Sequence, residues 1–169
     1  ESKIATVCKP CDARAIIELA KRNEIALENL LLIGINCTGT LPSVTTKKML
    51  QDEFGVDPAD VVREDIDGGK LVIRLKDGSE KAKTLDELEE KGYGRRENCR
   101  RCDFNIPRMA DIACGKWGAE GKGATFIEVC SDKGSAFIEK AIQAGAIEVE
   151  SPDSTAVETR RRKDEEEVE

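Results

Sequence analysis

The chain has 169 residues, and its 27 Lys and Arg against 34 Asp and Glu give a net charge of -7. This acidic balance argues against a nucleic-acid binder that works by charge alone, and the absence of histidine excludes Ser-His-Asp and Cys-His catalysis and any metal site that needs imidazole. No apolar run approaches the roughly 20 residues that span a bilayer.

The first 54 residues predict two successive strand-loop-helix units. Residues 4–7 form a strand, and Asp12 is expected to cap a helix over 13–24. The apolar run at 30–35 is a second strand, and a second helix covers about 44–54. Cysteines follow both strands, which predicts an α/β layer whose functional loops lie at the carboxyl ends of its strands.

The middle of the chain has a different pattern. Residues 70–76 alternate between apolar and polar, and they meet residues 80–83 across the turn sequence Asp77-Gly78-Ser79, which predicts a β-hairpin. Thr84 and Glu87 have the spacing of a capping box, and they predict a short helix that ends at Gly92.

The last third returns to alternating strands and helices. Strands are expected at 110–114, 125–130 and 146–150, with a helix over 135–144. The sequence therefore predicts an α/β or α+β fold with a mixed sheet and a central hairpin, in one domain over residues 1–150. Residues 151–169 are rich in charge, and we expect a solvated or disordered tail there.

Seven cysteines carry most of the functional signal. Cys8 and Cys11 form one C-x-x-C pair, and Cys99 and Cys102 form another. An odd number of cysteines without an apolar signal segment argues against a secreted disulfide framework and favours a reducing, cytoplasmic compartment. Thiolates select zinc or iron–sulfur clusters, so the pairs indicate a soft metal.

A [4Fe–4S] cluster needs four thiolates. Cys37 directly follows the second predicted strand, so Cys37, Cys99 and Cys102 with one or both of Cys8 and Cys11 can supply them. Residues 93–118 carry six basic and three acidic side chains, and this positive charge suits an anionic cluster. A structural zinc site and free or redox-active thiols are the alternatives.

The other two cysteines, Cys114 and Cys130, lie in strand-like stretches, and we interpret them as core residues. A glycine-dense connector over 115–123 would let a flat or phosphorylated ligand approach the backbone. A simple flexible loop explains this connector equally well.

Four motifs occur in order and together resemble a known family. They are Lys9-Pro-Cys11, Gly34-Ile-Asn-Cys37-Thr-Gly-Thr40, Cys99-x-x-Cys102-Asp-Phe and Ala110-Asp-Ile-Ala-Cys-Gly-Lys-Trp-Gly118. Over residues 4–150 the chain resembles the beta subunits of coenzyme F(420)-dependent hydrogenases and formate dehydrogenases, most closely those of formate dehydrogenases. The resemblance implies an α/β electron-transfer subunit with one [4Fe–4S] cluster and FAD, which exchanges electrons with the deazaflavin coenzyme F(420).

The resemblance also implies which residues bind these groups. The cluster ligands would be Cys11, Cys37, Cys99 and Cys102, with Cys8 as a fifth candidate beside Cys11. The flavin would lie against two glycine-bearing loops, made of Thr38, Gly39, Thr40, Gly115, Lys116, Trp117 and Gly118. No side chain is assigned a catalytic role, because the chemistry belongs to the cofactors. Family members have a preceding region, so this chain is expected to lack an N-terminal part.

The implied partner is the catalytic subunit of a formate dehydrogenase or a hydrogenase. Neither nucleic acid nor a membrane span is expected. Two rival hypotheses remain: a structural zinc-binding adaptor that docks a partner through its arginines, and a relative in the same family that uses NAD(P) or a heterodisulfide reductase partner as its electron carrier.

Overall fold

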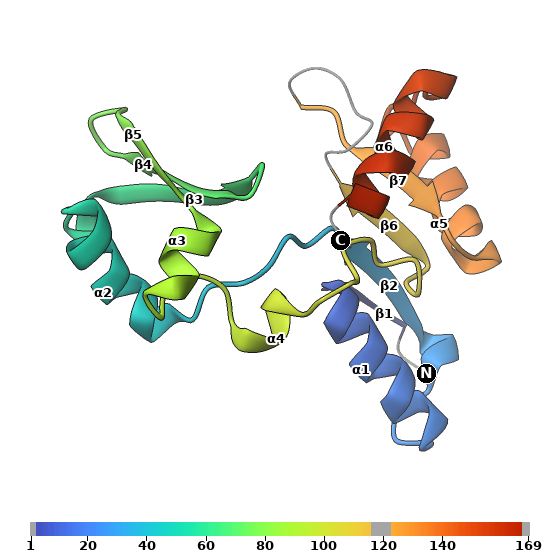
Figure 1. Ribbon diagram of the computed structural model, residues 1–169. Helices are drawn as coiled ribbons and strands as arrows, with labels where there is room; N and C mark the ends of the chain where they lie inside the picture. The colour runs from blue at the N-terminus through green and yellow to red at the C-terminus, as the bar shows by residue number, and fades with distance from the viewer. Residues whose placement is uncertain (1–2, 116–122, 167–169) are drawn as a thin grey trace. The chain divides into compact units, whose positions relative to one another are not determined.

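The computed structural model describes residues 3–115 and 123–166, and it divides into two compact units (Figure 1). Unit 1 consists of Glu1–Cys37 and Asp103–Glu169, and unit 2 consists of Thr38–Cys102. The chain thus leaves unit 1 directly after Cys37 and returns to it directly after Cys102. The residues for which the sequence predicts one domain are divided between these two units.

Unit 1 is built on a mixed four-stranded sheet in the order β1-β2-β6-β7. Its strands are β1 (Ile4–Cys8), β2 (Leu30–Ile35), β6 (Ile112–Gly115) and β7 (Phe126–Val129). Strands β1, β2 and β6 are parallel, and β7 is antiparallel to β6. The mixed sheet and its strand-loop-helix units confirm the predicted fold class.

Helix α1 (Pro10–Lys21) begins earlier than the sequence predicts. Pro10 occupies the first helical position, where its fixed φ suits the helix and its missing N–H costs nothing. Asp12 is not the cap itself, because its carboxylate accepts a hydrogen bond from the backbone N–H of Lys9, the actual N-cap residue, at 3.0 Å. Cys11 therefore lies inside the first turn of the helix.

A buried carboxylate ties the sheet of unit 1 to helix α5 (Asp132–Gln143). Asp111 accepts hydrogen bonds from the Leu32 N–H at 2.8 Å and from the Ser131 hydroxyl at 2.6 Å, and Lys133 lies 3.2 Å from the same carboxylate. Ser131 also caps α5 by accepting from the Gly134 N–H. These bonds satisfy a charge that would be costly to bury alone.

Unit 2 combines a three-stranded antiparallel sheet with short helices. Its elements are α2 (Ser43–Phe54), β3 (Val61–Asp67), β4 (Lys70–Leu75), β5 (Glu80–Thr84), α3 (Leu85–Glu90) and α4 (Glu97–Arg100). The predicted hairpin is confirmed as β4 and β5, and Thr84 caps α3 through the Glu87 N–H as expected. Strand β3 was not predicted, because its charged run Arg63-Glu64-Asp65 hides any apolar alternation.

The core of unit 2 is larger than the core around α1 in unit 1. Its buried side chains come from α2, β4, α3 and the segment after α2: Met49, Leu50, Phe54, Val56, Leu71, Ile73, Leu85 and Leu88. The buried cluster around α1 has four small or medium residues, namely Cys8, Ala13, Leu32 and Ala110. Apolar burial stabilises each unit separately.

One prediction near the C-terminus differs from the structure. The strand predicted at 146–150 is absent, because the apolar side chains there have no neighbouring strand and Val149 remains 50 % exposed. Helix α6 (Ser154–Glu166) lies in the segment for which the sequence predicts a solvated or disordered tail, and most of its described side chains are exposed. Among the residues that the structure describes, no helix is both long and apolar enough to cross a bilayer.

Candidate cysteine site

Cys8 is a core residue of unit 1. It is 3 % exposed, at the end of β1, and it packs with Ala13 and Leu32. Burial raises the pKa of its thiol, and the nearby Asp12 and Asp111 carboxylates raise it further. Because Cys8 is buried in this core whereas Cys11 is exposed, the geometry favours Cys11 over Cys8 as a ligand.

Cys11 is exposed in the first turn of α1. The pKa of its thiol is raised, first by partial loss of solvent around the sulfur, then by the Asp12 carboxylate and by Cys37, whereas Lys9 lowers it. The influence of Cys37 on this pKa means that the two thiols lie near each other within unit 1.

Cys37 is held by the segment that follows the second C-x-x-C pair. Its N–H donates to the Asn105 carbonyl at 3.0 Å, directly after β2. Pro107 lies so close to Gly34 of β2 that a Cβ on this glycine would overlap with the proline ring. Asn105 and Pro107 are both buried. Because Gly34 has no side chain, residues 105–107 can pack against the end of β2.

An arginine lies on the same side of α1 as Cys11. Arg14 follows Cys11 by three residues, which places both on one helix face. Its guanidinium stacks on the Phe104 ring at 3.9 Å from the ring centre. Phe104 comes two residues after Cys102. The positive charge of Arg14 is therefore held against the segment of unit 1 that follows this cysteine.

The other C-x-x-C pair belongs to unit 2. Cys99 is half-buried in α4, Cys102 is exposed, and the Cys102 N–H donates to the Cys99 carbonyl at 3.4 Å. The Arg96 N–H donates to the Thr40 carbonyl at 2.9 Å. The segment that leads into α4 is therefore bonded to the loop that begins directly after Cys37.

Ion pairs neutralise much of the positive charge that the sequence places around these cysteines. Arg95 and Arg100 pair with Glu89, Arg101 pairs with Glu97, and Arg108 pairs with Glu128. The pairs of Arg101 and Arg108 are largely exposed, and such pairs contribute little to stability. The pairs of Arg95 and Arg100 with Glu89 are the more buried ones.

The residues assigned to the flavin are only partly described. Lys116, Trp117 and Gly118 lie outside the described residues, Thr38, Gly39 and Thr40 belong to unit 2, and Gly115 belongs to unit 1. A Cβ on Gly39 would overlap with the Arg95 side chain, and a Cβ on Gly115 would overlap with the Asn36 amide. Both glycines make room for a neighbouring side chain, which is a sufficient reason for glycine at these positions.

Cys114 and Cys130 are half-buried rather than fully buried, and their structural role, as opposed to ligation, stays a prediction. Cys114 lies in β6 beside Ile35 and Ile127. Cys130 follows β7, and its thiol donates to the Glu128 carbonyl at 3.5 Å. The cysteine that does belong to the core is Cys8, whose place in a C-x-x-C pair suggested ligation instead.

The four candidate ligands divide evenly, with Cys11 and Cys37 in unit 1 and Cys99 and Cys102 in unit 2. Within residues 3–115 and 123–166, no three Cys, Asp or Glu side chains are grouped as in a metal site. Four thiols without imidazole are the donor set of an iron–sulfur cluster or a zinc ion, so the chemistry of the residues fits either group.

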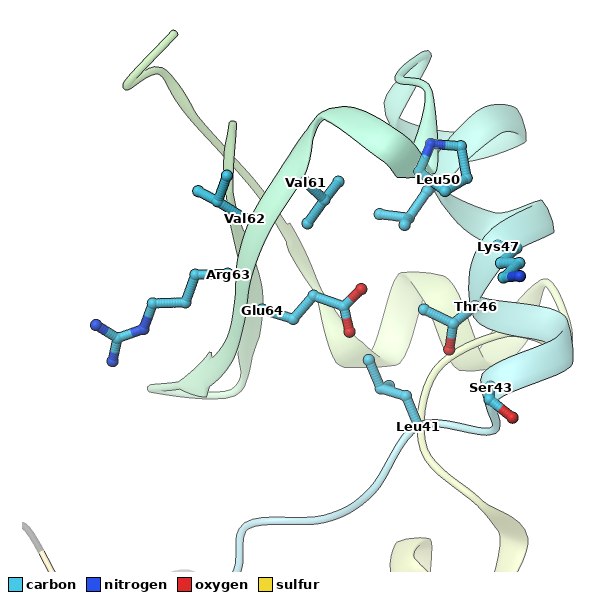
Figure 2. A pocket seen from close by; sticks show the side chains of 10 residues that line it. Leu41, Ser43, Thr46, Lys47, Leu50, Val61, Val62, Arg63 and Glu64 are labelled. Carbon is cyan, nitrogen blue, oxygen red and sulfur yellow. The ribbon is translucent and has the colours of Figure 1, made fainter. Parts of the chain in front are cut away.

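A hollow of about 480 Å³ lies in unit 2 between α2 and β3 (Figure 2). Leu41, Leu50 and Val61 give it apolar walls, and Glu64 points into it. None of the cysteines or predicted flavin residues lines it. Its walls carry no group of side chains that would support redox chemistry.

The comparisons with known proteins agree with the motif pattern. Residues 1–155 match the family model that describes the C terminus of the coenzyme F(420) hydrogenase/dehydrogenase beta subunit. The chain is 52 % identical over 162 residues to the F(420)-dependent formate dehydrogenase subunit beta of Methanocaldococcus jannaschii, covering 96 % of this chain and 42 % of that protein.

Two further matches extend this comparison. The chain is 48 % identical to the F(420)-dependent formate dehydrogenase 1 subunit beta of Methanococcus maripaludis, over 96 % of this chain and 43 % of that protein. The chain thus spans less than half the length of these relatives. The fold matches a chain in the xenon-derivatised F(420)-reducing [NiFe] hydrogenase complex of Methanosarcina barkeri with a TM-score of 0.79 and 17 % identity, over 99 % of this chain and 58 % of that chain.

Proposed function

The chain belongs to the family of coenzyme F(420) hydrogenase/dehydrogenase beta subunits, in the part that forms their C terminus, and from this premise we propose that it is part of an electron-transfer subunit. The whole protein transfers electrons between a catalytic subunit and the deazaflavin coenzyme F(420), and it works in the cytoplasm. Its cofactors are one [4Fe–4S] cluster and FAD.

The partner that we propose is the catalytic subunit of a formate dehydrogenase. The two formate dehydrogenase beta subunits are 52 % and 48 % identical to this chain, whereas the coenzyme F(420) hydrogenase subunit beta of Methanococcus voltae is 27 % identical over 154 residues. The alternative partner is the catalytic subunit of a hydrogenase.

The observation that carries the proposal is the arrangement of thiols at the two passages of the chain between the units. Cys37 is the last residue before one passage, and Cys102 is the last residue before the other. Cys11 lies near Cys37 in unit 1, and Cys99 is hydrogen-bonded to Cys102 in unit 2. Cys102 also precedes by three residues the Asn105 carbonyl that binds the Cys37 N–H.

We propose that these four thiolates bind the cluster, while Cys8 fills the core of unit 1. When bound, the cluster and the flavin supply one-electron and hydride chemistry, which no side chain of this chain could perform alone. The protein supplies the thiolates, which must lose their protons on binding, and the Arg14 charge on the face of α1 that carries Cys11. Thr38, Gly39, Thr40 and residues 115–118 remain the proposed flavin contacts.

The experiment that tests this function is a cofactor analysis of the intact protein, purified without oxygen. The proposal expects iron, acid-labile sulfide and FAD together, and electron transfer to coenzyme F(420) when the catalytic partner and formate are added. Stoichiometric zinc without sulfide would make the chain a structural adaptor. If NAD(P) were reduced in place of coenzyme F(420), the chain would still be part of an electron-transfer subunit, but its electron carrier would be NAD(P).

A further inference from the structure

We propose that Glu89 is a positioning residue that holds the Cys99 turn in place and sets the charge around it, a role that rests on the proposed function of Cys99 as a cluster ligand. Glu89 lies in α3, ten residues before Cys99, and nothing in its local sequence distinguishes it from the other acidic residues of that helix. Its contacts distinguish it instead.

The Glu89 carboxylate collects donors from the segment that leads to Cys99. Its side chain is only 13 % exposed. It accepts from the Arg95 side-chain Nε at 2.8 Å and from the Arg95 backbone N–H at 3.3 Å, and the Arg100 Nε lies 3.7 Å from its other oxygen. One carboxylate thus binds both ends of residues 95–100.

Gly94 allows this close approach. It is buried and has a φ of +81°, a conformation that side chains other than glycine rarely adopt. A Cβ at this position would lie 2.6 Å from the Cγ of Glu89. The backbone of the segment therefore packs directly against the glutamate side chain, and any larger residue would displace it.

The two arginines pass this constraint on to the cysteine turn. Arg95 lies against Gly39, in the loop that begins after Cys37. Arg100 donates to the Tyr93 carbonyl at 2.8 Å and to the Arg95 carbonyl at 3.2 Å. Because Arg100 is the residue after Cys99, fixing its side chain limits the positions that the Cys99 backbone can take.

The same carboxylate balances the charge of the two arginines. Burial raises the pKa of Glu89, but the hydrogen bond and charge of Arg95, together with Arg100, outweigh burial and lower the pKa overall, so the carboxylate is ionised at neutral pH. Replacing it with a neutral side chain removes this counter-charge from Arg95 and Arg100, which lie on either side of Cys99 in the sequence. A more positive surrounding favours the reduced, more negative state of a cluster bound there.

The chain provides a matched control in Glu53. Its side chain is 12 % exposed, and it binds two cations, Lys83 at 2.7 Å and Lys91 at 2.6 Å. Glu53 lies in α2, in the same unit, but its partners lie outside residues 95–102. Glu53→Gln therefore removes an equally buried carboxylate that pairs with two cations, without touching the cysteine turn.

The experiment compares Glu89→Gln with Glu53→Gln in the intact protein by two readouts. In the metal-free protein, the alkylation rate of Cys99 is measured by peptide mass spectrometry. In the loaded protein, the reduction potential of the cluster and its loss to a chelator are followed by spectroscopy. We expect Glu89→Gln to speed Cys99 alkylation, to raise the potential, and to weaken metal retention roughly 10-fold, as is typical when a partner of a metal ligand is lost.

Glu53→Gln should change none of these quantities. A Glu89→Gln variant that matches Glu53→Gln in both alkylation and potential overturns the inference, because a merely structural glutamate would behave in that way. A wild-type protein without iron and sulfide would refute the proposed function instead, and the alkylation comparison would then decide the positioning role by itself.

Discussion

The two units hold their candidate thiols by different means. In unit 1, Cys11 and Cys37 follow the ends of parallel strands β1 and β2, and backbone bonds and packing fix them, through the α1 capping box and the Asn105 carbonyl. In unit 2, Cys99 and Cys102 lie at a four-residue helix that a buried glutamate and two arginines hold in place.

The difference has a physical consequence. Backbone geometry at strand ends depends little on salt or pH, whereas ion pairs weaken with screening and with loss of one charge. The cysteine turn in unit 2 should therefore be more easily disturbed than the cysteine positions in unit 1. The predictions below separate the two halves, in order of decreasing expected effect.

Truncation of the core of unit 2 should have the largest effect. Leu88 is fully buried in α3, directly before Glu89, and Leu88→Ala leaves a cavity. We expect a loss of about 2–5 kcal/mol in the free energy of unfolding, measured by urea denaturation. Val44→Ala, at a position 83 % exposed in the same unit, should change stability by less than about 0.5 kcal/mol. Equal effects in the two variants would contradict the assigned core.

The packing of unit 1 is tested by Gly34→Ala. The added Cβ overlaps with Pro107, so the segment that binds Cys37 must move, at a cost of about 1–3 kcal/mol. Cys37 alkylation in the metal-free protein should also change. Gly145→Ala serves as the control, because that glycine has a φ of +66° but nothing near its Cβ. Equal rates of Cys37 alkylation in Gly34→Ala and Gly145→Ala would contradict the proposed packing role of Gly34.

The packing in unit 2 is tested by two neighbouring glycines. Gly92 and Gly94 share a φ of +81°, so alanine at either position causes a backbone strain of about 1–2 kcal/mol. Only at Gly94 does the new Cβ meet Glu89. We therefore expect Gly94→Ala to cost more stability in urea denaturation than Gly92→Ala and to speed alkylation of Cys99. Identical results at the two positions would remove the argument for close packing on Glu89.

The smallest effect concerns the pH dependence of Cys11. In the metal-free protein, its raised pKa keeps the thiol protonated at neutral pH, so its alkylation should be slow there and rise with pH until the raised pKa is passed. Asp12→Asn removes a negative charge that raises this pKa but retains an acceptor for the Lys9 N–H. The variant should therefore react faster near pH 7. A slower reaction would contradict the conclusion that Asp12 raises the pKa of Cys11.

The features that the sequence predicts well in each unit have a local cause. Strand ends and helix caps follow from neighbouring residues, so β1, β2 and the places of Cys11 and Cys37 could be predicted, although Pro10 moved the start of α1. The role of Glu89 could not be predicted, because it depends on a glycine five residues away and on arginines whose partners only the fold reveals.

Burial of individual cysteines was equally hard to predict. Cys8 and Cys11 share a C-x-x-C pair, yet one is buried and the other exposed, because the strand ends between them and the helix begins. Cys114 was expected in the core, but it lies in a strand near an incompletely covered part of the sheet, where Ile35 is 42 % exposed. Neighbouring residues in the sequence do not show which face of a sheet a helix covers.

The most direct test of a four-thiolate site with two ligands in each unit is the iron and sulfide content of three anaerobically purified proteins: the wild type, Cys11→Ser and Cys99→Ser. We predict about four irons and four sulfides per chain in the wild type and loss of both in each variant, because a [4Fe–4S] cluster needs all four thiolates. A wild-type protein with zinc and no sulfide, or a full cluster in either variant, would contradict the account.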